Sequence, residues 1–283
     1  MPGRRRVRYA LPDQPEVTLV VPTGGKLRFL RPGLESLSRQ TTYPNIRFLV
    51  IDNSSGEEVA ELCAELAATG VAIQREPLPL QPFNFSALIN HAVRMVDTPY
   101  LVLLNDDMTV ITPDWIEAML EHAQQPEVGA VGCKLLYPDD TIQHAGVVFG
   151  PHEGAVHPFR HFPDSHPGYF GIHQVVRNVS AVTFACAMLR RSIFEEVGLL
   201  DEVDFRVAFN DSDFCLRILD RGYRIVYTPH AVLRHYESAT KKTIADAGEV
   251  AALRERWGEF IRHDPFYNPN LTRAGENYGL DMR

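Results

Sequence analysis

Short apolar runs alternate with helical patterns through the first half of this 283-residue chain, and this alternation limits the folds open to it more than any other feature. Apolar runs at 17–21, 48–51 and 100–104 each have the length of a buried strand, and 71–73 is a candidate for another. Between them, apolar residues recur at helical spacing. Repeated strand–helix–strand order predicts an α/β domain with a mostly parallel central sheet and helices on both faces.

The second half is less regular. We expect strands and helices there, but no internal repeat. The expected strands are 129–136, 145–149, 182–189 and 223–227, and the expected helices are 191–197, 211–220 and 249–262.

The composition and charge of the chain argue against several classes of protein. Apolar residues make up 45% and charged residues 23%, as in ordinary globular proteins. A net charge of −8 argues against a nucleic-acid partner, and no apolar run approaches the ~20 residues of a membrane span. Residues 1–15 form a basic tail without the apolar stretch of a signal peptide, so we expect a cytoplasmic protein. We interpret these basic N-terminal residues as a solvated tail, and the alternative is that they contact a membrane surface.

Polar clusters follow three of the expected strands. They are Thr23-Gly24-Gly25, Asp52-Asn53 and Asn105-Asp106-Asp107. Because α/β sheets bind ligands at the carboxyl ends of their strands, we expect these clusters to form one pocket. Asn84 stands where a helix N-cap is expected. Gly24-Gly25-Lys26 does not match a phosphate-binding P-loop, because Leu27 follows the lysine.

The acidic turn at 105–107 indicates a cation site. Adjacent carboxylates at the end of a buried strand repel each other unless a cation or hydrogen-bond donors offset their charge. Mg²⁺ and Mn²⁺ take oxygen ligands and commonly bridge carboxylates to substrate phosphates. The alternative is a solvated turn that caps the helix expected near Pro113.

Two further features carry candidate chemistry. In Asn210-Asp211-Ser212-Asp213, one aspartate is expected to cap the following helix; Asp213 is better placed to cap, and Asp211 for chemistry. His235 follows the expected strand at 223–227. Six histidines between 144 and 173 match no zinc-binding spacing, so we interpret that segment as a polar loop over the active site.

Together these clusters resemble the inverting GT-A glycosyltransferases of family 2, over roughly residues 16–270. Residues 17–23, 40–45, 52–55, 103–107 and 209–217 match the family's motifs in order, and His235 matches its late metal-ligand histidine. Segments 83–87, 113–115, 132–138, 142–146 and 178–183 are similar to bacterial O-antigen and rhamnan-type members. Two positions depart from the family pattern: Asn105 replaces the first aspartate of the DxD motif, and Asn210 replaces a glutamate.

The resemblance implies transfer of a sugar from a nucleotide-diphosphate donor to a saccharide or lipid-linked saccharide, with inversion, in cell-surface polysaccharide synthesis. It implies a divalent cation, Mn²⁺ or Mg²⁺, held by Asp107 and His235, and Asp211 as the base. The donor site would comprise Pro22, Thr23, Asp52, Asn53, Asn84, Asn105 and Asp106.

The domain it implies covers 16–263, with a nucleotide-binding half (16–110), an acceptor-binding half (111–263) and an irregular tail at 264–283. Two alternatives stay open. One is a non-catalytic module that binds a nucleotide sugar or a partner. The other is a sugar-1-phosphate nucleotidyltransferase, although its glycine-rich start is absent.

Overall fold

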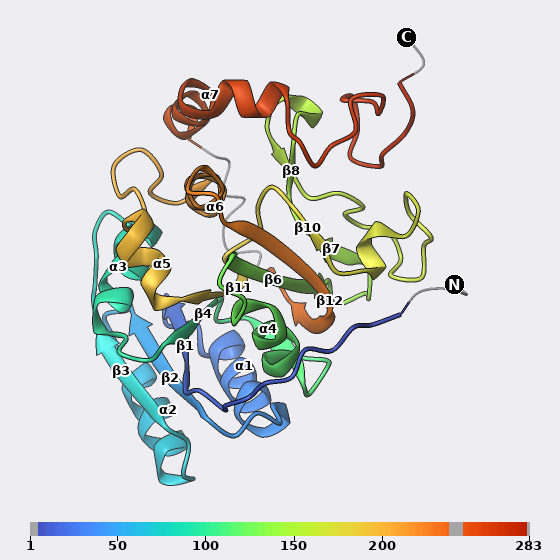
Figure 1. Ribbon diagram of the computed structural model, residues 1–283. Helices are drawn as coiled ribbons and strands as arrows, with labels where there is room; N and C mark the ends of the chain where they lie inside the picture. The colour runs from blue at the N-terminus through green and yellow to red at the C-terminus, as the bar shows by residue number, and fades with distance from the viewer. Residues whose placement is uncertain (1–4, 238–245, 282–283) are drawn as a thin grey trace.

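The computed structural model describes residues 5–237 and 246–281, and it has one large mixed sheet at its centre (Figure 1). The first half forms the parallel part of this sheet, in the order β3-β2-β1-β4. Its strands are β1 (Val17–Thr23), β2 (Ile46–Asp52), β3 (Ile73–Pro77) and β4 (Tyr100–Leu104), and its helices are α1 (Leu27–Gln40), α2 (Glu58–Ala68) and α3 (Phe85–Met95).

The second half extends the same sheet beyond β4. Antiparallel β11 lies between β4 and β6, and β12 runs parallel to β6. The strands of this half are β5 (Met108–Val110), β6 (Val128–Leu136), β7 (Ile142–His144), β8 (Val148–Phe149), β9 (Ala155–Val156), β10 (Arg177–Asn178), β11 (Cys186–Arg190) and β12 (Arg224–His235). Of these, β8 and β9 pair with each other in a separate two-stranded sheet. The helices are α4 (Trp115–Ala123), α5 (Arg191–Val197), α6 (Asn210–Asp220) and α7 (Ala247–Arg262), with 3₁₀ turns at Pro151–Glu153 and Ile172–Gln174.

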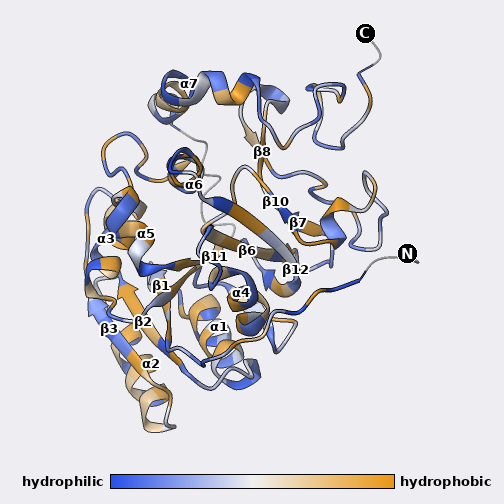
Figure 2. Ribbon diagram, in the orientation of Figure 1, coloured by the Kyte–Doolittle hydropathy of each residue, from blue (hydrophilic) through white to orange (hydrophobic). Residues whose placement is uncertain are grey.

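Alternation of side chains along the strands creates two cores. In β4, Leu101 and Leu103 point to one face and Val102 and Leu104 to the other. The first face packs against α3, α5, α6 and α7, and the second against α1, α2 and α4. The predicted fold class, a mostly parallel sheet covered on both faces, is confirmed. Figure 2 shows the edge strand β3 as largely hydrophilic, which protects its open side from pairing with another chain.

Several predicted boundaries need correction. The third strand is Ile73–Pro77 rather than 71–73, and the strand expected at 182–189 begins at Cys186. Of the strand expected at 145–149, only Val148–Phe149 forms, as β8, and β7 (Ile142–His144) comes before it. The last strand continues well beyond residue 227, and so His235 is its final residue rather than part of a following loop.

Arg6, Tyr9 and Ala10 contact α4, so the N-terminal segment is tethered there, although none of residues 5–15 is buried; residues 1–4 of the expected solvated tail lie outside the described residues. The Arg6 guanidinium is 3.1 Å from the Glu121 carboxylate, and the Gln124 side chain donates to the Ala10 carbonyl at 2.9 Å. Tyr9 packs edge-on against the His122 ring. No helix in the described ranges is both long and apolar enough to cross a bilayer.

Candidate functional site

The three polar clusters meet at one edge of the sheet, as expected for the ends of neighbouring strands. The Thr23 hydroxyl at the end of β1 donates to Asp106 Oδ2 at 2.6 Å. The Asn53 N–H, after β2, donates to the Thr23 carbonyl at 2.9 Å. These contacts connect segments that are up to 83 residues apart in sequence.

Asp106, which follows β4 at this edge, has a carboxyl with a raised pKa. Burial raises the pKa of its carboxyl to about 6, and the nearby Asp107 charge adds to that rise. The hydrogen bond from Thr23 acts in the opposite direction and favours the ionised form. A cation bound at this turn would therefore favour the ionised form of Asp106 and lower its pKa.

Asp107 and His235 face each other, although 128 residues separate them in the chain. His235 Nε2 lies 3.0 Å from Asp107 Oδ1, and both residues are buried. Pairing of β5 with β12 places His235 opposite Met108, next to the acidic turn. Within the described ranges, no group of three or more His, Cys, Asp or Glu side chains is arranged to hold a metal. A cation here would take two protein ligands and draw the others from substrate and water, which is the usual arrangement for Mg²⁺ at phosphate sites.

The other side chains predicted for the donor site are already engaged by protein groups. Asp52 is fully buried; its two oxygens accept from Ser54 N at 2.9 Å and from Arg75 Nε at 2.8 Å. Asn53 Oδ1 accepts from the Leu80 N–H at 2.5 Å. Direct contact between Asp52 and a nucleotide thus requires the surrounding side chains to move, and it stays a prediction. Pro22 lies in β1, paired with Ile51 of β2.

Asn84 is the N-cap of α3, as predicted. Its Oδ1 accepts from Ala87 N at 3.0 Å, and its Nδ2 donates to the Glu202 carbonyl at 2.9 Å. Both ends of the amide therefore bind protein and join α3 to the loop before α6. The structure shows a supporting role, while contact with a donor stays a prediction.

Asp211 occupies the first turn of α6. Its Oδ1 accepts from the Ser212 N–H at 2.6 Å, and the Phe184 backbone and the Thr183 hydroxyl also hydrogen-bond to the carboxylate. Burial nonetheless raises the pKa of Asp211 above its ordinary value, because desolvation outweighs these donors. The carboxylate is therefore more basic than an exposed aspartate.

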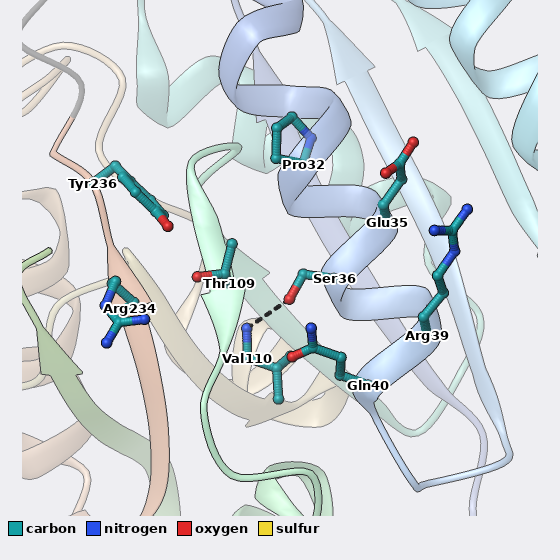
Figure 3. A pocket seen from close by; sticks show the side chains of 9 residues that line it. All are labelled: Pro32, Glu35, Ser36, Arg39, Gln40, Thr109, Val110, Arg234 and Tyr236. Carbon is teal, nitrogen blue, oxygen red and sulfur yellow. Dashed lines mark hydrogen bonds between the residues drawn. The ribbon is translucent and has the colours of Figure 1, made fainter.

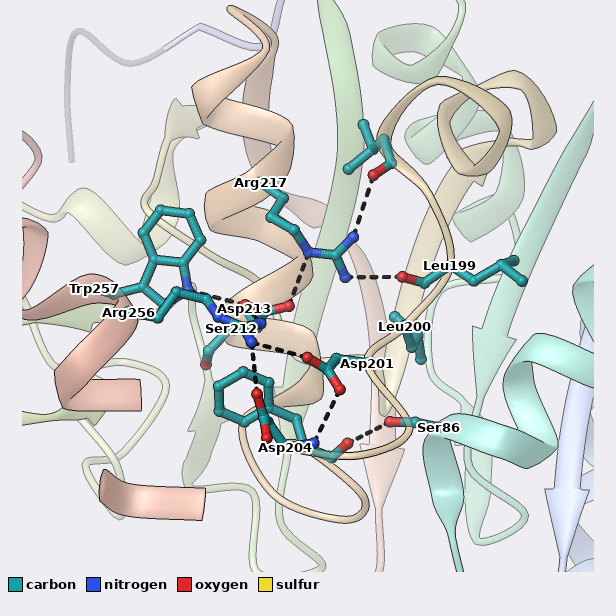
Figure 4. Close-up of polar contacts among 12 residues, drawn as sticks. Ser86, Leu199, Leu200, Asp201, Asp204, Ser212, Asp213, Arg217, Arg256 and Trp257 are labelled. Carbon is teal, nitrogen blue, oxygen red and sulfur yellow. Dashed lines mark hydrogen bonds and ion pairs between the residues drawn. The ribbon is translucent and has the colours of Figure 1, made fainter. Parts of the chain in front are cut away.

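Asp213 does not cap α6, and that expectation was wrong. Its Oδ2 is 2.8 Å from Arg217 Nε, and its Oδ1 accepts from Arg256 Nη1 and Trp257 Nε1, each at 2.9 Å (Figure 4). The side chain points away from the helix end, and the N-cap position is Phe209, whose side chain makes no capping bond. Asp213 instead joins α6 to α7.

A cavity of about 220 Å³ lies between His235 and Thr183, which contact Asp107 and Asp211 respectively. His235, Thr183, Ala185, His157, Arg160, Gln143 and Glu237 line it. Thr183 also contacts Asp211, and the Asn105 N–H donates to the Ala185 carbonyl at 3.0 Å. Of the predicted base and cation ligands, His235 lines the cavity itself, and Asp107 and Asp211 each contact a residue that lines it.

The histidine-rich segment contributes part of this cavity wall. His157 lines it, and His157 Nδ1 lies 3.0 Å from Nδ1 of the buried His144. His173 is fully buried beside Phe159 instead. The interpretation as a polar loop over the active site therefore fits His157 but not His173.

Sequence reasoning missed four residues of this site: Gln143, Thr183, Arg75 and Arg160. Gln143 and Thr183 lie within segments that match O-antigen-type enzymes, which was the available signal. Nothing in the sequence pairs Arg75 with Asp52. Gly33 of α1 was missed too: a Cβ there would lie 2.9 Å from the Asp106 carbonyl and 3.1 Å from the Met108 carbonyl, so the helix approaches the acidic turn closely.

A second hollow, of about 400 Å³, lies between α1, β5 and the end of β12 (Figure 3). Tyr236 lines it, and the Tyr236 N–H donates to the Asp107 carbonyl at 3.1 Å. At its floor, the Ser36 hydroxyl accepts from the Val110 N–H at 2.9 Å. This bond fixes β5 to α1 behind the acidic turn.

The family model for glycosyl transferase family 2 matches residues 18–198, which includes β1, the acidic turn and most of the cavity wall. The chain belongs to this family. The match ends before Asp211 and His235, and so the roles of those two residues are not covered by it.

Among curated relatives, an uncharacterized protein, y4gI, of Sinorhizobium fredii is 40% identical over 99% of the chain. The O-antigen biosynthesis protein RfbC of Myxococcus xanthus is 39% identical, also over 99%. The chain spans only 32% and 22% of these two relatives. The O-antigen chain rhamnosyltransferase RfbN of Salmonella typhimurium is 24% identical over 80% of the chain and 68% of its own length.

Two solved structures share the GT-A fold. A mannosyltransferase of Pyrobaculum calidifontis, solved with GDP-Man and Mn²⁺, has a TM-score of 0.58 at 17% identity, over 96% of this chain and 71% of its own. GalNAc-T7, solved with UDP, GalNAc and Mn²⁺, has a TM-score of 0.67 at 10% identity, over 92% and 53%. At these identities the likeness concerns the fold alone.

Proposed function

We propose that this family 2 member is an inverting glycosyltransferase that moves a sugar from a nucleotide-diphosphate donor to a hydroxyl of a saccharide or lipid-linked saccharide. The observation that carries the proposal is the Asp107–His235 pair, 3.0 Å apart, with His235 lining the same cavity as Thr183, which contacts Asp211. Relatives named for O-antigen synthesis support a cell-surface polysaccharide as the product. We place the reaction on the cytoplasmic side, with peripheral membrane contact.

Asp107 and His235 have the chemistry of a Mn²⁺ or Mg²⁺ site. A carboxylate oxygen and an imidazole nitrogen, both able to accept, lie 3.0 Å apart in a buried setting, where a cation would offset their repulsion. The bound ion would act as a Lewis acid toward the leaving diphosphate. Both acceptors come from chain segments fixed by β5–β12 pairing, so their separation is set before ligand binds.

Asp211 would accept the proton of the attacking hydroxyl. Its carboxylate has a raised pKa through burial, and Ser212 and Thr183 fix its orientation. A correctly placed general base contributes roughly 10²–10⁴-fold to the rate. Thr23 and Asp106 would contact the nucleotide side of the donor, since they end β1 and β4 at the same edge.

Isothermal calorimetry with UDP, GDP and dTDP, each with and without Mn²⁺, tests the donor and cation site. We expect at least one nucleotide to bind in a Mn²⁺-dependent way, and Asp107→Ala or His235→Ala to abolish that dependence without loss of fold. Asp220→Asn, at the exposed end of α6, is the matched control and should bind as the wild type does. Unchanged Mn²⁺-dependent affinity in both site variants would contradict the assignment.

A non-catalytic nucleotide-sugar-binding module would pass that binding test as well. Hydrolysis of UDP-, GDP- and dTDP-sugars by the wild-type protein with Mn²⁺ separates the two possibilities. Turnover that is lost in Asp211→Asn supports the enzyme, and binding without any turnover would favour the module.

A further inference from the structure

We propose that Gln143 is a positioning residue that fixes the tautomer of His235 and keeps its Nε2, beside Asp107, without a proton. The inference rests on the proposed cation site and adds a residue to it. His235 Nδ1 lies 2.5 Å from Gln143 Oε1, and both side chains are buried. Gln143 is the middle residue of β7, at a register shift between Ile142 and His144, which both pair with β6 and hold the segment on either side of it.

The orientation of the Gln143 amide follows from its other neighbour. Gln143 Nε2 donates to Glu237 Oε2 at 3.4 Å, and an ionised carboxylate can only accept. Arg160 holds that carboxylate in place, with its Nη2 3.1 Å from Glu237 Oε1. The amide must therefore present its NH₂ group to Glu237 and its oxygen to His235.

The amide oxygen in turn fixes the imidazole. Because Gln143 Oε1 can only accept, His235 Nδ1 must carry the proton, and in the neutral ring Nε2 is then an acceptor. The contact at Nε2 agrees with this, since Asn105 Nδ2 donates to it at 3.2 Å. Nε2 and Asp107 Oδ1 are thus two acceptors 3.0 Å apart, the arrangement that a divalent cation would bridge.

Glutamine suits this position because its amide does not titrate. These side chains contact one another in a row that begins at the half-exposed Arg160–Glu237 ion pair, continues through Gln143 and ends at the buried ring of His235. The charged pair at the outer end orients the amide without placing a second carboxylate against the imidazole. A change at Gln143 should therefore alter the tautomer of His235, whereas a residue that only fills space would leave it unchanged.

The tautomer is measured directly by ¹⁵N NMR of the metal-free protein at pH 8, with the His235 signals identified by their loss in His235→Gln. We expect the Nδ1–H form in the wild type. Gln143→Leu, which has a similar volume and no acceptor, should lose that preference. The exchanged pair Gln143→Glu/Glu237→Gln restores an acceptor at 143 and a donor at 237, and it should recover the Nδ1–H form.

Mn²⁺ affinity supplies the second measurement, followed through the EPR signal of free Mn²⁺ with the metal alone as probe. Loss of an outer-shell partner typically weakens metal binding 10–100-fold, and we expect a drop in that range for Gln143→Leu. The exchanged pair should bind Mn²⁺ at least as tightly as the wild type, because a carboxylate acceptor keeps the Nδ1–H tautomer and raises the basicity of the ring. Gln124→Leu, which removes a glutamine hydrogen bond next to the N-terminal segment, is the matched control and should bind normally.

The outcomes separate the inference from the proposed function. An Nε2–H tautomer in the wild type, or wild-type tautomer and affinity in Gln143→Leu, would overturn the role of Gln143. Weakened affinity that the exchanged pair fails to recover would also overturn it, since packing alone would explain the loss. An Nδ1–H wild type that binds no Mn²⁺ would instead uphold the tautomer lock and overturn the proposed cation site.

Discussion

Two carboxylates in the first turns of α6 have opposite surroundings. From sequence alone, a helix N-terminus would lower the pKa of Asp211 and burial would raise it. In the structure burial dominates, and the pKa is raised despite several hydrogen-bond donors. Asp213, two residues on, meets two arginines and a tryptophan from its own helix and from α7.

Exchanging each aspartate for asparagine should separate catalysis from stability. Asp211→Asn keeps the shape but cannot accept a proton, so we expect kcat to fall by roughly 10²–10⁴-fold with donor Kd near wild type. Asp213→Asn leaves Arg217 and Arg256 without their buried carboxylate, and we expect a loss of about 2–4 kcal/mol in the free energy of unfolding. Steady-state kinetics and urea denaturation of both variants measure this. A larger kcat loss in Asp213→Asn would reverse the assignment.

Contacts between site residues could be predicted where the order of the strands alone determines which side chains lie close together. Thr23 and Asp106 meet because β1 and β4 are neighbours that end at the same edge. It failed for Arg75, whose partner Asp52 lies on the adjacent strand, and for Gln143, whose contact with His235 spans 92 residues. Such pairings depend on register and loop path, which no local pattern encodes.

At the scale of elements, the acidic turn depends on the close approach of α1. The space at Gly33 is occupied by backbone carbonyls of residues 106 and 108, which cannot swing aside as a side chain can. Helical periodicity predicted α1, but not that its glycine faces this turn. The length of β12 was missed for a similar reason: Pro229 interrupts the strand pattern, and the structure accommodates it at a register shift between Thr228 and Val232.

Two glycine-to-alanine changes in helices should have opposite effects. Gly33→Ala places its Cβ within 3.0 Å of the Asp106 carbonyl, so we expect about 1–3 kcal/mol of destabilisation and weaker Mn²⁺-dependent nucleotide binding. Gly258→Ala in α7 meets only an arginine tip at 3.6 Å, and the gain in helix propensity should stabilise the protein by up to about 1 kcal/mol. Thermal and urea unfolding of both variants provide the comparison. Equal stabilisation by both would show that α1 does not press on the turn.

At the scale of the molecule, the proposed division into halves at residue 110 does not coincide with a break in the sheet. β4 of the first half pairs with β11 of the second, and β5 pairs with β12. Residues beyond 263 also join the core: Tyr267, Leu271 and Tyr278 are buried with residues of the α3–α5–α6–α7 face. The segment expected to be an irregular tail lacks regular structure but is packed, because these three apolar side chains turn inward, while Leu280 stays exposed.

The two tryptophans test whether this continuity makes the protein one cooperative unit. Trp115 is fully buried on the face covered by α1, α2 and α4, and Trp257 packs on the opposite face, where it donates to Asp213. In Trp115→Phe and Trp257→Phe, fluorescence reports the remaining tryptophan alone, while far-UV circular dichroism reports the whole chain. Because every layer shares one sheet, we expect the two signals to give the same urea midpoint within each variant, even though the variants differ from each other in stability. In Trp115→Phe, a change in Trp257 fluorescence at lower urea than the loss of circular dichroism would mean that α7 and the packed C-terminal segment detach before the sheet unfolds. The Arg256–Asp213 contact would then break at a free energy below that of global unfolding.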